Sequence, residues 1–130
     1  MFRRQKEGRM KESELERKFR IMVQKAGGRA YKFVSPGNDG VPDRLVVLPG
    51  GRIGFVELKR KGGAPGKQQQ YRMKELEDMG CFTAVVDDLE KAEEVLAKIR
   101  KQVPQLQKTD SLFLEMVNRR PHTGNGGEAK

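Results

Sequence analysis

Cysteine, histidine and tryptophan are almost absent from this chain. Its 130 residues include one cysteine, one histidine and no tryptophan. Cys81 therefore has no partner for an internal disulfide, and Cys81 and His122 alone supply too few ligands for a tetrahedral zinc site. These absences exclude an internal disulfide scaffold and argue against structural zinc and against catalysis that depends on histidine.

Long apolar runs are also missing. No stretch is long and apolar enough to cross a membrane, and Met1-Phe2-Arg3-Arg4 is not followed by the apolar run of a signal peptide. We therefore expect a protein of the host-cell cytoplasm. Hydrophobic and charged residues each make up 35% of the chain, which suits one domain with a small core and a heavily charged surface.

Positive charge, by contrast, is present in excess. Lys and Arg number 27 against 18 Asp and Glu, which gives a formal net charge of +9. Residues 1–34 hold the largest share, with 11 basic and 4 acidic side chains. This balance favours a polyanionic partner, although a basic surface that serves only solubility would have the same composition.

A β-hairpin is predicted in the middle of the chain. Residues 45–48 and 53–58 are two runs rich in β-branched and other apolar residues, and Gly50-Gly51 lies between them. A Gly-Gly pair between apolar runs is a strong hairpin signal. The two runs should therefore pair as antiparallel neighbours.

Three charged residues should meet at one end of this hairpin. Asp43 precedes the first strand, and Glu57 and Lys59 end the second, so antiparallel pairing brings them together. Glu57 and Lys59 are two positions apart and share a face with Phe55, because strand side chains alternate. Charges beside a buried apolar surface are costly unless they are paired or bind a metal.

This grouping indicates metal-assisted phosphodiester hydrolysis. Two carboxylates provide hard oxygen ligands for Mg²⁺ or Mn²⁺, and an adjacent ammonium can orient or deprotonate a water and offset phosphate charge. The alternative is that Asp43 is a turn residue and that Glu57 and Lys59 form a solvated strand end. A bare Glu-x-Lys is common by chance, whereas Pro-Asp, a Gly-Gly hairpin and Glu-x-Lys together are much more specific.

Pro42-Asp43, followed after 13 intervening positions by Glu57-Leu58-Lys59, resembles the signature of the PD-(D/E)xK nuclease superfamily. Within it, roughly residues 10–94 resemble the virus-type replication-repair nuclease (VRR-NUC) domain in its stand-alone, phage-like form. The blocks that carry this resemblance are Glu12-Ser13, Gly27-Gly28, Lys32-Phe33-Val34-Ser35-Pro36-Gly37, Gly40-Val41-Pro42-Asp43-Arg44 and Phe55-Val56-Glu57-Leu58-Lys59.

The resemblance implies a restriction-endonuclease-like core, an α/β fold with a mixed β-sheet flanked by helices. The helices and strands expected along the chain, in the order αβββαβα, fit an α/β sandwich independently. The resemblance also implies that Asp43, Glu57 and the backbone carbonyl of Leu58 bind Mg²⁺ or Mn²⁺, and that Lys59 orients or activates the attacking water. The number of metal ions stays open.

Glu12 is a further candidate metal ligand. Residues 12–26 predict a helix whose apolar side chains fall on one face. Projecting that face backward puts Glu12 near it, Glu16 at its edge and Glu14 well round the helix. In nucleases that this chain resembles, a glutamate of the first helix often completes the metal shell. Glu12 could equally serve only to favour the helix N-terminus electrostatically.

Gln69 is a candidate catalytic residue from a second predicted helix, residues 68–79. The apolar stripe of Met73 and Leu76 continues back to Gln69, so this side chain should face inward. The resemblance points to the same glutamine, ten positions after the motif lysine, as a residue that helps to orient the lysine or a phosphate. Gln68 would replace it if the register slips by one, and three exposed glutamines are the alternative.

The substrate and assembly follow from the resemblance. Stand-alone domains of this kind resemble structure-selective endonucleases that act on branched double-stranded DNA, with four-way (Holliday) junctions as the leading substrate, and no nucleotide cofactor is expected. Symmetrical cutting of two strands needs two active sites, which favours a homodimer. The alternatives are a non-catalytic nucleic-acid-binding module and a nuclease that acts on flaps, nicked or linear duplex DNA. Expected DNA contacts are Lys32, Arg44, Arg60 and Lys61.

The chain divides into three parts. We interpret residues 1–11 as a basic flexible arm, residues 12–103 as the nuclease domain and residues 104–130 as a tail with a possible short helix followed by disorder. Within the domain, residues 81–86 predict a strand. Asp87, with Glu90 three positions later, predicts the cap of the last helix.

Overall fold

The computed structural model describes residues 10–102. The expected arm 1–11 and tail 104–130, with its possible short helix, therefore lie mostly or wholly outside the described residues. The order of elements within the described part is αβββαβα, as the sequence predicted. The elements are α2 (Glu12–Lys25), β1 (Arg29–Lys32), β2 (Arg44–Leu48), β3 (Arg52–Leu58), α3 (Lys67–Asp78), β4 (Thr83–Val86) and α4 (Leu89–Arg100).

The four strands form one mixed sheet in the order β1-β2-β3-β4. β1, β2 and β3 are antiparallel neighbours, and β4 runs parallel to β3. The predicted hairpin is confirmed: β2 pairs with β3, and Leu45 lies opposite Phe55. Gly50 and Gly51 turn the chain with φ angles of +88° and +74°, a region that side chains other than glycine rarely adopt.

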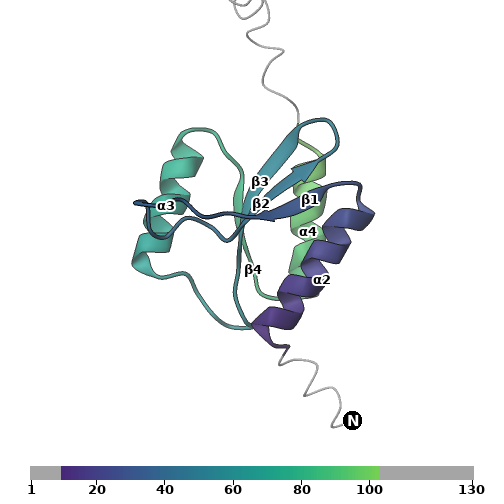
Figure 1. Cartoon of the computed structure of the whole chain (residues 1–130), viewed down its shortest axis with the longest axis horizontal. Helices are drawn as coiled ribbons and strands as arrows, with labels where there is room; N and C mark the ends of the chain where they lie inside the picture. Colours follow the sequence, from purple (N-terminus) through teal and green to yellow (C-terminus); the bar gives the residue numbers. More distant parts are fainter. Residues whose placement is uncertain (1–9, 103–130) are drawn as a thin grey trace, which may run out of the picture.

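The helices lie on both faces of the sheet (Figure 1). α2 and α4 pack together on one face, whereas α3 lies on the other. The main core fills the space between the sheet and the helices α2 and α4, where Phe19, Val56 and Ile99 are fully buried. Gly54 allows α4 to approach closely, because a Cβ atom there would lie 2.6 Å from the Ile99 side chain. The fold is the mixed α/β architecture that the sequence predicted.

The start of α4 differs from the sequence prediction by one residue. Its N-cap is Asp88, whose carboxylate accepts a hydrogen bond from the Lys91 backbone N–H. Asp87 was the expected cap, but its carboxylate instead accepts a hydrogen bond from the Gly62 backbone at 3.2 Å. Adjacent aspartates satisfy the capping pattern almost equally well, so the pattern alone could not separate them. No helix within residues 10–102 is long and apolar enough to span a bilayer.

Candidate active site

Glu57 lies on the sheet face that α3 covers. Its neighbours Val56 and Leu58 point to the opposite face, into the core, because successive strand side chains alternate. Glu57 is nevertheless only 2% exposed. Phe55 shares its face and packs against Phe33, with ring centroids 5.4 Å apart. The alternation of the strand predicted that Glu57 and Phe55 share this face, whereas the contact with Phe33 comes from the fold.

Two reciprocal hydrogen bonds join Asp43 to the end of β3. The Asp43 backbone N–H donates to Glu57 Oε1 at 3.2 Å, and the Leu58 backbone N–H donates to Asp43 Oδ2 at 3.3 Å. On its other side, the Asp43 carbonyl accepts a hydrogen bond of 2.7 Å from the Phe33 backbone N–H. Asp43 is thus fixed between its two neighbouring strands, with its carboxylate beside that of Glu57.

The second oxygen of Glu57 faces Gln69 and Lys59. Gln69 Nε2 donates to Glu57 Oε2 at 2.7 Å, and Lys59 Nζ lies 3.4 Å from the same oxygen. Gln69 Oε1 accepts from the Gly66 backbone N–H at 3.0 Å, which also satisfies the first turn of α3. The sequence prediction that Gln69 faces inward is therefore confirmed. Its contact is Glu57, whereas the resemblance suggested the lysine or a phosphate.

Burial dominates the electrostatics of Glu57. Desolvation raises the pKa of Glu57 above its ordinary value, and repulsion from Asp43 raises it further. The Lys59 ammonium and the hydrogen bond from the Asp43 backbone oppose this rise in pKa without cancelling it. An ionised Glu57 is therefore costly in the free protein, and a bound cation would relieve that cost.

This raised pKa predicts a pH dependence of stability. The folded protein binds the Glu57 proton more tightly than the unfolded chain, where glutamate titrates near about 4.3. The contribution of Glu57 to the free energy of unfolding is therefore greatest below that pH and falls as pH rises through the folded pKa. Urea unfolding of wild type and Glu57→Gln from pH 4 to 8 would measure this contribution. We expect the stability of wild type relative to the variant to fall with pH, and a constant difference would contradict the prediction.

Comparison with known proteins finds a related sequence and a related solved structure. No family model matches the chain. The chain is 46% identical over 78 residues to "Putative nuclease p44" of Acyrthosiphon pisum secondary endosymbiont phage 1, and the match covers 60% of this chain and 84% of the phage protein. A solved structure described as a VRR_NUC domain shares its fold with a TM-score of 0.63 and 26% identity, over 66% of this chain and 94% of that one. The chain belongs to the VRR-NUC family.

The VRR-NUC domain gathers two carboxylates at this site. Within residues 10–102, no three His, Cys, Asp or Glu side chains come close enough to hold a metal ion. Glu12 therefore does not form one cluster with Asp43 and Glu57. It lies at the start of α2 and lines a separate pocket between that helix start and the turn 60–63.

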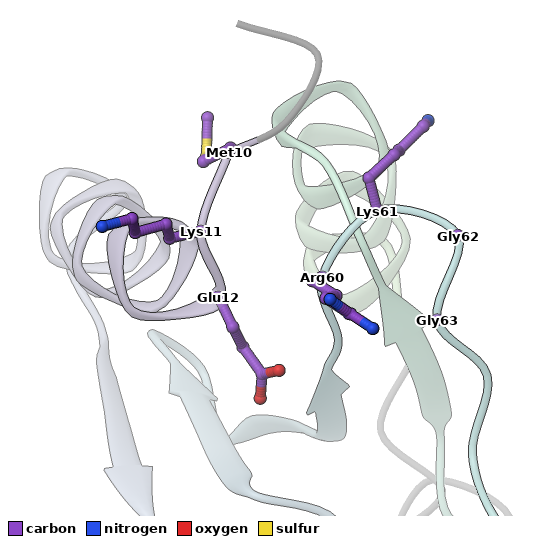
Figure 2. A pocket seen from close by; sticks show the side chains of 7 residues that line it. All are labelled: Met10, Lys11, Glu12, Arg60, Lys61, Gly62 and Gly63. Carbon is purple, nitrogen blue, oxygen red and sulfur yellow. The ribbon is translucent and has the colours of Figure 1, made fainter. Parts of the chain in front are cut away.

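A pocket of about 600 Å³ is lined in part by the residues that follow Lys59 in the sequence. One wall is the start of α2, from Met10 to Glu12, and the other is the turn 60–63. Figure 2 shows that the side chains of Glu12 and Arg60 extend into the space between these walls, whereas that of Lys61 points away. The pocket therefore offers the Arg60 guanidinium to a ligand near the end of β3.

The other expected DNA contacts are placed differently. Lys61 Nζ lies 2.7 Å from the Asp88 carboxylate, so its charge is already paired. Lys32 is exposed but lies in register with Val56, on the face opposite Glu57. Arg44 is buried and pairs with Glu16, which gives it a role in packing where the sequence suggested a DNA contact.

The loop before Asp43 is attached to α3, a contact that the sequence did not reveal. Gly40 has φ +93° and packs so closely that a Cβ atom there would lie 2.8 Å from the Gln68 carbonyl oxygen. One turn further along α3, Arg72 Nε donates to the Asp39 carbonyl at 3.0 Å. Gly40 therefore permits the close approach of α3 to this loop.

Proposed function

We propose that this protein is a metal-dependent DNA endonuclease that hydrolyses phosphodiester bonds at the site formed by Asp43, Glu57 and Lys59. The observation that carries the proposal is that both carboxylates and the lysine meet through direct contacts at the ends of two paired strands. A packing role alone does not account for this arrangement, since burial of Glu57 and then repulsion from Asp43 raise the pKa of Glu57, and an ionised Glu57 there weakens the fold.

The donor set supports Mg²⁺ or Mn²⁺ as the metal. Asp43 and Glu57 present carboxylate oxygens, which these cations prefer, and both desolvation and repulsion from Asp43 disfavour the ionised Glu57 in the free protein. Asp43 and Glu57 would hold the cation, with the Leu58 carbonyl as a further ligand. When bound, the cation would polarise the scissile phosphate and lower the pKa of a water ligand.

Lys59 would act on the attacking water. Its side chain is 23% exposed and its ammonium lies 3.4 Å from Glu57 Oε2, so Lys59 borders both the carboxylates and solvent. We propose that it orients the water oxygen toward phosphorus and offsets the charge that develops on the phosphate oxygens. The water oxygen would form a new bond to phosphorus and release a proton to solvent as the P–O bond to the leaving strand breaks, and the leaving oxygen would take up a proton from solvent. Gln69 holds the Glu57 carboxylate in place and is a positioning residue.

The proposed substrate is branched DNA, with the four-way junction first. The family likeness and the excess of basic residues support a nucleic-acid substrate. Symmetrical cutting of a junction needs two sites related by a two-fold axis, so we propose a homodimer. Flaps and nicked duplexes share the exposed backbone of a branch point and are the competing substrates.

The deciding experiment compares a labelled four-way junction with flap, nicked and linear duplex DNA of the same sequence. Each is incubated with Mg²⁺, Mn²⁺ or EDTA. Metal-dependent cleavage of the junction well above that of the linear duplex is expected, with a dimer by light scattering. Tight binding without cleavage under every metal condition would contradict the nuclease proposal and favour a binding module. Equal cleavage of all substrates would refute only the junction preference.

Arg60 should contribute to DNA affinity through a phosphate. It is exposed and extends into the pocket between the start of α2 and the turn 60–63. Arg60→Gln should weaken binding of every DNA and lower the log-log salt slope by about one, because one phosphate contact is lost. Lys25→Gln is the matched control, since it removes the same charge from the exposed far end of α2. Fluorescence polarisation in EDTA at several salt concentrations measures both, and equal slopes for the two variants would refute the contact.

A further inference from the structure

Arg44 is a buried arginine immediately after Asp43. It is 7% exposed and lies in register with Val56, on the face that packs against α2. Its Nη2 forms an ion pair with Glu16 of α2, and its Nη1 donates to the Ala30 carbonyl of β1 at 3.4 Å. Its Nε is buried and has no hydrogen-bond partner among residues 10–102. The guanidinium thus joins β2 to both α2 and β1.

Stability does not explain this arrangement. Burial lowers the pKa of Arg44, which reflects the cost of removing its charge from water. Replacing a buried ion pair by well-packed apolar side chains is often neutral or stabilising. The unpartnered Nε adds a further cost, since a buried polar group without a hydrogen bond destabilises the fold. Glu16 is more than a third exposed, so it would stay solvated if Arg44 were replaced.

The position of Arg44 instead suggests control of geometry. Arg44 is the first residue of β2, and Asp43 lies just before that strand begins. The two side chains point to opposite faces, so anchoring one sets the direction of the other. The Asp43 side chain must keep this direction for its carboxylate to accept the hydrogen bond of 3.3 Å from the Leu58 N–H. On the helix side of the sheet, the contacts of Arg44 fix the start of β2.

We propose that Arg44, held by Glu16, is a positioning residue that aims the Asp43 carboxylate at the metal site. This inference rests on the proposed function, because it assigns a purpose to the direction of Asp43. Partners that orient metal ligands in this way typically change metal affinity or activity about 10- to 100-fold when they are removed. The side chain touches neither the substrate nor the metal, so it acts only through Asp43.

The test uses the whole protein and three variants. Arg44→Met keeps the length and apolar stem of the side chain, and Glu16→Gln removes only the charge of the partner. Arg52→Met is the matched control, because Arg52 also bonds to backbone carbonyls, those of Gln102 and Pro49 at 3.0 Å, at the opposite end of β3. Mn²⁺ binding to the free protein is measured by electron paramagnetic resonance, unfolding by calorimetry and cleavage by kcat and KM.

We expect Arg44→Met to unfold at or above the wild-type temperature while its Mn²⁺ affinity falls about 10- to 100-fold. Its kcat should fall at fixed Mn²⁺ with KM for DNA unchanged. Glu16→Gln should show a smaller loss of the same kind, and Arg52→Met should keep wild-type Mn²⁺ affinity.

Wild-type Mn²⁺ affinity in a folded Arg44→Met would overturn the inference. If Arg44→Met does not fold, unchanged Mn²⁺ affinity in folded Glu16→Gln would overturn it, and a specific loss would support it. An equal loss in Arg52→Met would also overturn it, because the effect would then be general. Wild-type protein that neither binds Mn²⁺ nor cleaves DNA would refute the proposed function and this inference with it. An active wild type with unaffected variants would refute the inference alone.

Discussion

Asp43→Asn should abolish cleavage while leaving DNA binding and folding nearly intact. Asparagine keeps an oxygen that can accept the hydrogen bond from the Leu58 N–H, so the local structure should persist. The variant removes only the negative charge. A metal that stabilises charge in the transition state contributes several kcal/mol, so a loss of its ligand should lower kcat by about 1,000-fold or more.

Asp39→Asn is the matched control for this variant. Asp39 lies four positions earlier in the same loop, and it contacts Arg72 through its backbone carbonyl, so the substitution leaves that bond unchanged. Single-turnover cleavage of the preferred substrate and DNA binding in EDTA should be measured for both. Loss of DNA binding in Asp43→Asn would mean that Asp43 supports the structure and does not act in catalysis. Equal loss of cleavage in Asp39→Asn would mean that the whole loop matters.

Local rules were sufficient to predict the carboxylate site. Strand alternation put Glu57 and Phe55 on one face, and the Gly-Gly turn fixed the pairing that brings Asp43 to the same end. Helical spacing likewise predicted that Gln69 faces inward. Each of these inferences depends only on residues within a short segment, which is why the sequence alone supports them.

Strand alternation also bears on Arg44. Its position has the same parity as Val46 and Leu48, which places it on the core face of β2. Its charge suggested the surface instead. What makes its burial possible is Glu16, which lies 28 positions earlier on α2. A long-range partner of this kind depends on how a helix packs on the sheet, and no local pattern in the sequence specifies that.

The contacts of the turn after Lys59 are also long-range, so the sequence alone did not predict them. The basic composition of residues 60–63 indicated a DNA contact, but Lys61 and the Gly62 N–H are bonded to the two aspartates that precede α4. These bonds hold the turn against the start of α4. Arg60 is left extended into the pocket. Composition gave the charge of this segment, whereas the pairing of β3 with β4 determines which of its charges meets an acidic partner.

Lys59→Met should lower kcat by about 100- to 1,000-fold, the usual range when a group that stabilises developing charge in the transition state is removed. Mn²⁺ binding provides a second, independent readout. The Lys59 ammonium lowers the pKa of Glu57, so its removal should leave that pKa higher still. Glu57 would then be less ionised at low pH, and Mn²⁺ affinity in the variant should fall more steeply between pH 8 and pH 6 than in wild type.

These two effects separate the possible roles of Lys59. Lys67→Met serves as the control, because Lys67 is exposed at the start of α3, and it should keep wild-type kcat and pH dependence. A Lys59→Met variant that binds Mn²⁺ as wild type at pH 8 but does not cleave would assign Lys59 to the water and the phosphate. If cleavage recovers fully at pH 8, Lys59 acts only by keeping Glu57 ionised. Unchanged kcat at every pH would remove Lys59 from the mechanism. The ammonium would then serve only to balance the negative charges of Asp43 and Glu57.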